Sequence, residues 1–271
     1  MQTHFIAYKT SSICFSIIGS GPAVIICLHG FGENGTSFGV LEKSLGKNYR
    51  LLCLDLPFHG QTEWNEGLSV SREELVDIII LVLEKAGFKK EKNFSLLAYS
   101  LGGRIALQLV QIIPERIERL VLLAPDGLRI NFWYWLGTQT YSGNKLFDVT
   151  MQNPAWFFAM TNFANKIGLL NKSIIKFVHY YLDDAGLRLL LYMRWTALRK
   201  FKPDLAVVRK TISANKIPTR LVFGSYDRII LHKRSDVFKT DKANVKVVVL
   251  QAGHQLLKGK HVADIAKQFS N

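Results

Sequence analysis

The chain of 271 residues contains six short, predominantly apolar runs, and these runs restrict the possible folds more than any other feature of the sequence. They lie at residues 24–28, 51–54, 94–98, 120–124, 221–223 and 245–250. Runs of this length, rich in leucine and β-branched residues, are typical of strands buried on both faces, as in a parallel sheet. Helical patterns of apolar residues occupy 72–86 and 101–113 between them. The alternation predicts an α/β fold with a mostly parallel central sheet and helices on both faces.

The strand–helix alternation stops between residues 128 and 216. This segment carries helical patterns, many aromatic side chains and no convincing strand. It also holds 13 basic and 4 acidic residues, and therefore +9 of the formal net charge of +14. We expect residues 1–127 and 217–271 to form the core, and residues 128–216 to be a helical insertion that folds over the end of the sheet as a cap.

Ser100 lies between a predicted strand and a predicted helix. It is the third residue of the motif Ala98-Tyr99-Ser100-Leu101-Gly102-Gly103, which joins the apolar run 94–98 to the helical pattern 101–113. This is the context of a nucleophile elbow, in which a strained turn presents a serine hydroxyl above the sheet. Gly102 is the small residue that the close approach of the two backbones requires, whereas Ala98 stands where the usual pattern has glycine. A serine that only caps the helix is the alternative.

Four other segments carry the remaining features of a known family. They are His29-Gly30-Phe31, Asp55-Leu56-Pro57-Phe58-His59-Gly60, Gly224-Ser225-Tyr226-Asp227 and Gly253-His254. Together with the serine motif, and in this order, they resemble the α/β-hydrolase superfamily over nearly the whole chain. Phe58 departs from the family pattern, which has a glycine at its position. The resemblance implies the α/β-hydrolase fold and a catalytic triad in the order Ser100, Asp227, His254.

The triad assigns one chemical task to each side chain. A serine hydroxyl is a weak nucleophile at neutral pH and needs a neighbouring base, for which His254 is the candidate because it follows the last predicted strand. The acid that orients the histidine is predicted to be Asp227, which follows the run 221–223. Asp126, which follows the run 120–124, is the alternative acid, although turn chemistry in Pro125-Asp126-Gly127 also explains it.

Further residues are candidates for contact with the substrate. The resemblance implies an oxyanion hole formed by the backbone N–H groups of Phe31 and Leu101. The candidate substrate-binding side chains are His29, Tyr99, Arg104, Trp133 and Trp156. The segment that ends in Arg104 is similar to the elbow of the menaquinone-pathway lyases of this superfamily, which act on a polyanionic substrate. Pairing of Arg104 with a nearby carboxylate is the alternative.

These features predict a serine hydrolase that cleaves a carboxylic ester or related acyl bond through an acyl-enzyme on Ser100. Its substrate would be a small molecule with an apolar or aromatic acyl group, and the basic charge would suit an anionic one. A lyase or carbon–carbon bond hydrolase on the same triad is one alternative, and a non-catalytic ligand-binding protein on the hydrolase fold is another. A lipase whose basic aromatic cap contacts a membrane surface is a third.

Other classes of partner receive little support. We expect no cofactor and no metal, because the sequence has no glycine-rich phosphate loop and no cluster with metal-ligand spacing. We expect no nucleic-acid partner, because no binding motif accompanies the net charge of +14. Three scattered cysteines, no secretory signal and no apolar run of membrane length predict a cytoplasmic protein without disulfides.

Overall fold

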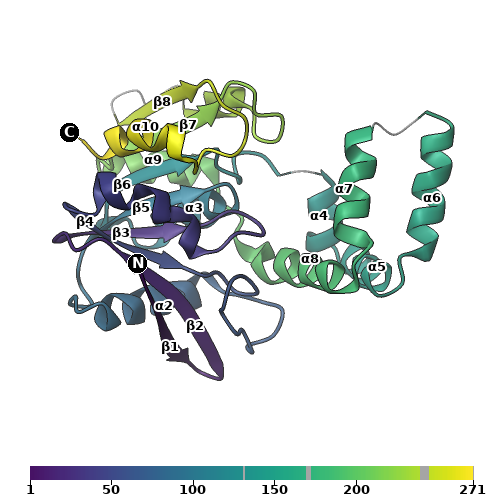
Figure 1. Cartoon of the computed structure of the whole chain (residues 1–271), viewed down its shortest axis with the longest axis horizontal. Helices are drawn as coiled ribbons and strands as arrows, with labels where there is room; N and C mark the ends of the chain where they lie inside the picture. Colours follow the sequence, from purple (N-terminus) through teal and green to yellow (C-terminus); the bar gives the residue numbers. More distant parts are fainter. Residues whose placement is uncertain (131, 169–171, 239–243, 271) are drawn as a thin grey trace. The chain divides into compact units, whose positions relative to one another are not determined.

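A computed structural model of the chain describes residues 1–130, 132–168, 172–238 and 244–270 (Figure 1). The chain forms two compact units. The first comprises Met1–Glu66, Val70–Arg129 and Lys200–Asn271, and the second comprises Gly67–Ser69 and Ile130–Arg199.

The first unit is built on one eight-stranded sheet. Its strands are β1 (Gln2–Tyr8), β2 (Ser11–Ile18), β3 (Ala23–Leu28), β4 (Tyr49–Leu54), β5 (Phe94–Tyr99), β6 (Ile117–Leu123), β7 (Thr219–Gly224) and β8 (Val245–Leu250). Their spatial order is β1-β2-β4-β3-β5-β6-β7-β8. The pairs β1–β2 and β2–β4 are antiparallel, and every other pair is parallel. The six apolar runs all fall on strands β3 to β8, which confirms the predicted mostly parallel sheet.

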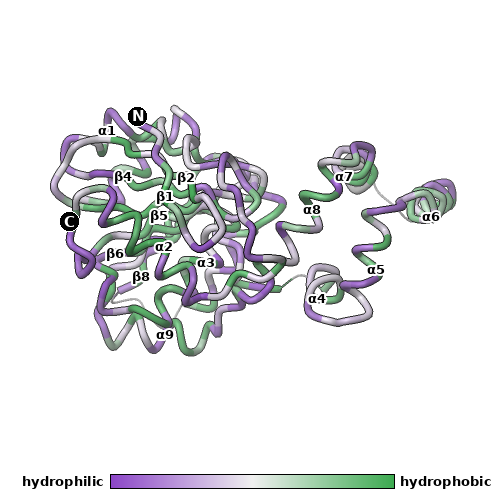
Figure 2. The backbone as a smooth tube through the Cα atoms, turned by 90° about the horizontal axis from the view of Figure 1, so that it is seen from below, coloured by the Kyte–Doolittle hydropathy of each residue, from purple (hydrophilic) through white to green (hydrophobic). Residues whose placement is uncertain are grey.

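Helices of the first unit pack beside one another in two groups. Helix α3 (Leu101–Ile112) contacts both α2 (Arg72–Lys85) and α9 (Leu205–Ala214), and α1 (Glu42–Leu45) contacts α10 (Val262–Ala266). Short 3₁₀ helices complete the connections: η1 (Gly35–Leu41), η2 (Pro114–Arg116), η3 (Leu198–Lys200), η4 (His232–Phe238), η5 (Gly259–His261) and η6 (Lys267–Phe269). Figure 2 shows hydrophobic residues concentrated along the strands that these helices cover.

The order in which the parallel strands are added to the sheet reverses at β3, and this reversal locates the candidate site. Strand β3 has β4 on one side and β5 on the other, so the connections to its two neighbours leave in opposite directions. Ligands of open α/β sheets bind beyond the carboxyl ends of the strands at such a switch point. The predicted oxyanion loop follows β3, and Ser100 follows β5, which places both predicted elements at this point.

The second unit is helical. Its helices are α4 (Phe132–Gln139), α5 (Tyr141–Gln152), α6 (Ala155–Lys166), α7 (Lys172–Leu182) and α8 (Ala185–Ala197). Some aromatic side chains of this unit pack against one another: the ring of Trp195 lies 5.2 Å from that of Tyr134 and 5.7 Å from that of Phe147. Aromatic pairs at such separations stabilise a small core beyond the area that they bury.

The second unit is shorter than the predicted insertion 128–216. It ends at Arg199, and α9 belongs to the first unit. The reason is that α9 packs against α3 and buries Val208 and Ile212 completely. A helical pattern in the sequence shows that a face is buried but not which neighbour buries it. That the second unit acts as a cap stays a prediction.

The loop after β4 depends on a buried carboxylate. Asp55 Oδ1 accepts a hydrogen bond from the Gly35 N–H at 2.7 Å, and Oδ2 accepts one from the Gln61 N–H at 2.8 Å. Gly60 must lack a side chain, because a Cβ there would lie 1.9 Å from Asp55 Oδ2. Asp55 therefore has the structural role expected of a loop residue that joins two segments beside the site.

We predict that Asp55→Ala lowers the free energy of unfolding by about 2–3 kcal/mol, because it leaves the buried N–H of Gly35 and the N–H of Gln61 without their acceptor. Urea denaturation followed by circular dichroism measures the change. Glu84→Ala, at an exposed position on α2, is the control and should change stability by less than about 0.5 kcal/mol. Equal effects of the two substitutions would contradict the role given to Asp55.

Candidate active site

Ser100 occupies a strained turn between β5 and α3. Its φ of 48° and ψ of −111° lie in a region that residues with a side chain rarely adopt. Two backbone hydrogen bonds hold it there: the Ser100 N–H donates to the Leu123 carbonyl at 2.9 Å, and the Ser100 carbonyl accepts from the Asp126 N–H at 2.9 Å. Such strain persists only where the surrounding structure enforces it, and it is frequent at active sites. The predicted elbow geometry is present.

Two glycines allow α3 to start against the sheet. A Cβ on Gly102 would lie 2.1 Å from the carbonyl oxygen of Leu28, at the end of β3. A Cβ on Gly103 would lie 2.6 Å from the Pro125 side chain. Ala98 pairs with Leu28 in the parallel ladder and is fully buried, so the fold accommodates its methyl group where the family pattern has glycine.

The three triad candidates form one chain of hydrogen bonds. His254 Nε2 lies 3.1 Å from Ser100 Oγ, and His254 Nδ1 lies 2.8 Å from Asp227 Oδ2. The other oxygen of Asp227, Oδ1, accepts hydrogen bonds from the N–H groups of Ile229 and Ile230 at 2.7 and 2.9 Å. This network assigns the proton of a neutral imidazole to Nδ1, which leaves Nε2 to accept from the serine hydroxyl.

Asp126, the alternative acid, has a different partner. Its Oδ2 forms an ion pair with Arg104, and its Oδ1 accepts a hydrogen bond from the Gly127 N–H at 2.7 Å. Arg104 is only 7% exposed. The carboxylate that contacts His254 is therefore that of Asp227, and Arg104 pairs with a nearby carboxylate, as its alternative interpretation expected.

The two predicted oxyanion donors belong to segments that converge on Ser100. Leu101 is the first residue of α3, so its N–H has no acceptor within the helix. A Cβ on Gly30 would lie 2.9 Å from the Tyr99 ring and 3.4 Å from Ser100 Cβ, so the backbone that leads into Phe31 passes close to the serine. The roles of Leu101 and Phe31 as donors stay predictions.

His29 is buried, although the sequence made it a candidate for substrate binding. Its ring is 0% exposed. Nδ1 lies 2.8 Å from the Gly30 carbonyl oxygen and Nε2 accepts from the Leu56 N–H at 3.0 Å, so the side chain joins the loops after β3 and β4. Phe58, in the second of these loops, has a φ of 63°, which accounts for the glycine usual at its position.

Tyr99 connects the elbow to the histidine loop. Its hydroxyl donates to the His254 carbonyl at 3.2 Å, and the two rings lie 5.4 Å apart. Burial raises the pKa of Tyr99, and the negative charges of Glu33 and Asp227 raise it further. Tyr99 therefore stays protonated and acts as a hydrogen-bond donor over the physiological pH range.

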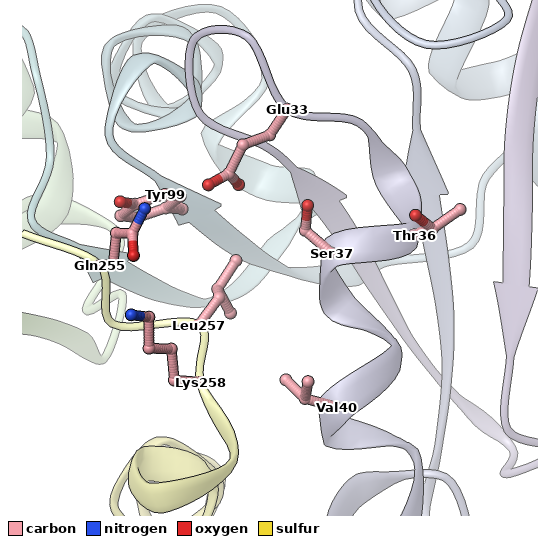
Figure 3. A pocket seen from close by; sticks show the side chains of 8 residues that line it. All are labelled: Glu33, Thr36, Ser37, Val40, Tyr99, Gln255, Leu257 and Lys258. Atoms are coloured by element: carbon pink, nitrogen blue, oxygen red, sulfur yellow. The ribbon is translucent and has the colours of Figure 1, made fainter.

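A pocket of about 320 Å³ lies beside these residues (Figure 3). It is lined by Glu33, Thr36, Ser37, Val40, Tyr99, Gln255, Leu257 and Lys258. Of these residues, the sequence had indicated only Tyr99. Glu33 and Gln255 could have been noticed from their positions, two residues after Phe31 and one after His254, but no motif contains them.

Trp133 and Trp156 belong to the second unit. They are 71% and 43% exposed, respectively. Their contact with a substrate stays a prediction, as does that of Arg104.

The remaining expectations concern metals, cysteines and membranes. Within the described ranges, no group of three or more His, Cys, Asp or Glu side chains is arranged to hold a metal ion. All three cysteines are buried and free, and burial raises the pKa of Cys14 to about 12. Among the helices of the described residues, none is long and apolar enough to cross a membrane.

Comparison with known proteins is consistent with this geometry. Residues 23–259 match the family model described as the alpha/beta hydrolase fold. The chain belongs to this family. This hydrolase is 29% identical to a pimeloyl-[acyl-carrier protein] methyl ester esterase of Nitrosomonas europaea over 233 residues, which is 84% of this chain and 82% of the relative. An uncharacterized hydrolase of Saccharomyces cerevisiae is 24% identical and covers 92% of this chain and 89% of its own length.

Solved structures give the same fold. An α/β hydrolase from a deep-sea metagenome library, MGS-M2, superposes with a TM-score of 0.68 at 18% identity and covers 99% of this chain and 98% of its own. A thioesterase domain from the curacin biosynthetic pathway superposes with a TM-score of 0.62 at 17% identity, covering 98% of both chains. The family and its relatives identify the protein as a hydrolase enzyme, and they support ester hydrolysis.

We predict that Gly102→Ala lowers the free energy of unfolding by about 1–3 kcal/mol, because the new methyl group forces α3 away from β3. The displacement of Ser100 should also slow its reaction with a serine-directed probe by about 100-fold. Denaturation and labelling kinetics measure the two effects. Gly259→Ala is the control, since a Cβ at that position meets nothing within 4 Å. A Gly102→Ala protein with wild-type values for both would show that the close approach is unimportant.

The two carboxylates should respond differently to amide substitution. Asp227→Asn should lower kcat for ester hydrolysis by about 10⁴-fold, because the amide cannot hold the required imidazole tautomer. Asp126→Asn should weaken the pairing with Arg104 and lower the melting temperature, while kcat of the folded protein stays within about tenfold of wild type. Steady-state kinetics with thermal melts of both variants would reveal the reverse order of effects if Asp126 were the acid.

Proposed function

We propose that this hydrolase cleaves a carboxylic ester through an acyl-enzyme on Ser100, with His254 as general base and acid and Asp227 as the group that orients it. The observation that carries the proposal is the unbroken hydrogen-bond chain from Ser100 Oγ through both ring nitrogens of His254 to the buried Asp227 carboxylate. This arrangement of nucleophile, base and orienting acid activates a hydroxyl that is otherwise unreactive at neutral pH.

The first half of the reaction acylates the enzyme. Ser100 Oγ attacks the ester carbonyl carbon while His254 Nε2 takes the hydroxyl proton. Asp227 keeps the imidazole oriented through Nδ1 and stabilises the imidazolium. Collapse of the tetrahedral intermediate breaks the bond to the alcohol oxygen, and the alcohol leaves with the proton from Nε2.

The second half repeats these steps with water. Nε2 takes a proton from the attacking water, the second tetrahedral intermediate collapses, and Ser100 Oγ recovers its proton as the carboxylic acid is released. In both halves, the N–H groups of Leu101 and Phe31 would donate to the oxyanion. Loss of one such donor typically costs about 3 kcal/mol of transition-state stabilisation.

The substrate is proposed to have an apolar or aromatic acyl group. The aromatic residues of the second unit suit such a group, and Trp133 and Trp156 are the first candidates for contact with it. The net charge of +14 would favour an anionic substrate. The name of the Nitrosomonas relative adds the methyl ester of an acyl chain carried on acyl-carrier protein as a substrate to test.

Neither the lyase nor the binding-protein alternative is favoured by the contacts of the site. A lyase that acts on a polyanionic substrate would use this side chain as an available cation, but here it pairs with Asp126. A binding protein without chemistry would not need an aligned base beside the serine. Ester hydrolysis is therefore the function that we carry forward.

Treatment with a fluorophosphonate probe tests the proposal. We expect one adduct per chain, located by mass spectrometry on Ser100, and hydrolysis of p-nitrophenyl esters by the unlabelled enzyme. Ser100→Ala should abolish both, and His254→Ala should slow labelling by at least about 10³-fold. The folded state of each variant is checked by circular dichroism.

Comparison of substrates refines the proposal. Rates for short and long acyl esters, and for neutral and carboxylated esters of equal length, separate the apolar from the electrostatic contribution. An adduct on another residue, or a folded wild-type protein that neither reacts nor turns over any ester, would reject the serine hydrolase assignment.

A further inference from the structure

Helix α6 of the second unit is rich in large apolar side chains, yet none of its residues is buried. Its sequence is Ala-Trp-Phe-Phe-Ala-Met-Thr-Asn-Phe-Ala-Asn-Lys. A helix of a folded domain normally buries one apolar side against a core. Single apolar side chains at a surface are common, but a contiguous group of them marks a surface that binds another molecule.

Four exposed side chains form one stripe along this helix, the α6 stripe: Trp156, Met160, Phe163 and Ile167. They are 43%, 49%, 65% and 53% exposed, respectively. Their spacing of four, three and four residues places them within about 60° of one another around the helix axis. The stripe runs from the second residue of α6 to the C-cap, Ile167. Helix α6 therefore presents a continuous apolar strip to solvent over nearly its whole length.

The opposite side of α6 contacts its own unit. Phe158 lies about half a turn away from the stripe, and its ring stacks on that of His179 in α7 at 5.6 Å (Figure 1). The exposed polar residues Asn162, Asn165 and Lys166 lie between the two sides or close to Phe158. Because Phe158 holds α6 against α7, the stripe points away from that helix.

The segment that contains the stripe is basic and has no acidic residue. Residues 149–182 include Lys166, Lys172 and Lys176 and contain neither Asp nor Glu. Lys166 is exposed at the C-terminal end of α6. A segment with this charge attracts an anionic surface, and no carboxylate within it opposes the attraction.

A phospholipid bilayer matches these features better than a protein surface does. Two copies packed stripe to stripe would bring together two basic segments, neither of which has a carboxylate to compensate the charge. An acidic protein would need donors for its carboxylates, but the only charged residue of α6 is Lys166. Fluid acyl chains accept apolar side chains without a matching shape, while lysines reach the phosphates of the headgroups.

We propose that the α6 stripe binds the surface of an anionic phospholipid bilayer, with its apolar side chains among the acyl chains and the lysines of the segment among the headgroups. Helix α6 lies along the surface, because its 12 residues span only about 18 Å, whereas the hydrocarbon core is about 30 Å thick. Trp156 at one end of α6 suits the boundary between headgroups and acyl chains. Binding of this kind needs no reaction at Ser100 and is therefore independent of the proposed function.

Sedimentation of the full chain with vesicles tests the proposal. Vesicles of phosphatidylcholine with about one third phosphatidylglycerol are compared with vesicles of phosphatidylcholine alone, at about 0.05 M and about 0.5 M NaCl. We expect binding to the anionic vesicles at low salt. The affinity should be at least about tenfold lower at high salt, and at least about tenfold lower for the neutral vesicles, because the lysines then lose their attraction to the surface.

Polar substitutions on the stripe should remove most of the binding. The stripe variant is Met160→Gln/Phe163→Gln/Ile167→Gln, which keeps the charge and uses a residue with good helix propensity. Its affinity for anionic vesicles should fall by at least about 30-fold, because three apolar side chains no longer enter the bilayer. Trp156 stays unchanged, since it is also a candidate for contact with the substrate.

Removal of charge tests the electrostatic part of the binding. The lysine variant, Lys166→Gln/Lys172→Gln/Lys176→Gln, should bind anionic and neutral vesicles about equally. It should keep the weak affinity of the wild-type chain for neutral vesicles, because the stripe is intact.

Two controls should bind like wild type. Val207→Gln/Val247→Gln/Val249→Gln removes three similarly exposed apolar side chains from the first unit. Ser100→Ala removes the nucleophile, so its binding shows that the result does not depend on whether the serine hydrolase assignment is correct.

Hydrogen exchange of the wild-type chain gives a second measurement that needs no variant. Backbone amides of residues 155–167 should exchange more slowly when anionic vesicles are present, because contact with the bilayer suppresses local opening of α6. Those of α2, in the first unit, should exchange at an unchanged rate. Unchanged exchange over 155–167 in a sample that sediments with the vesicles would place the contact elsewhere and overturn the proposal.

The sedimentation results can overturn the proposal in several ways. Absence of wild-type binding to anionic vesicles at low salt would do so. Binding that the lysine variant loses but the stripe variant keeps would show a purely electrostatic contact, of the kind that an acidic protein also offers. A stripe variant that melts at least about 5 °C below wild type without vesicles would show that the chain itself covers the stripe. A wild-type dimer and a monomeric stripe variant in light scattering would identify a second copy as the occupant.

Discussion

The close contact between the first turn of α3 and the end of β3 is the constraint on which the site depends. Gly102 has no side chain, so its N–H can donate to the His29 carbonyl at 3.0 Å and the two backbones can touch. This contact fixes the start of α3, and the start of α3 in turn holds Ser100 in its strained conformation. The strain is sustained by packing around the turn and not by the serine itself. The same contact brings the loop after β3, with its predicted oxyanion donor Phe31, beside the nucleophile.

The parallel sheet explains why much of the site could be predicted from the sequence. Ser100 and His254 are 154 positions apart, yet each follows a strand, and parallel strands end at one edge of the sheet. A run of apolar residues followed by a polar residue in a glycine-containing turn therefore marks a position at that edge. The six apolar runs predicted the strands, and the residues that follow β5, β7 and β8 are the ones that the structure joins by hydrogen bonds.

Features that depend on neighbours distant in sequence could not be predicted in this way. The second compact unit ends about one helix before the predicted insertion does, because the apolar pattern of α9 does not say that α3 covers it. Glu33 gave no signal, since a glutamate in a loop is normally solvated, and only the enclosing pocket with Tyr99 and Gln255 makes it unusual. His29 was a candidate for substrate contact because it lies beside the motif, and only the structure shows that its ring is buried between two loops.

The choice between Asp126 and Asp227 shows what the sequence leaves open. Both carboxylates follow strands, β6 and β7, that are neighbours in the sheet, so topology alone places both near the nucleophile. Their partners decide their chemistry. Arg104 compensates the charge of Asp126, whereas the side chain of Asp227 is fully buried and is hydrogen-bonded to the N–H groups of Ile229 and Ile230 and to the imidazole of His254. A guanidinium that pairs with a carboxylate compensates most of its negative charge, so the carboxylate stabilises a nearby histidine less. The position of Arg104, on the first turn of α3, therefore leaves Asp227 as the carboxylate available to act on the base.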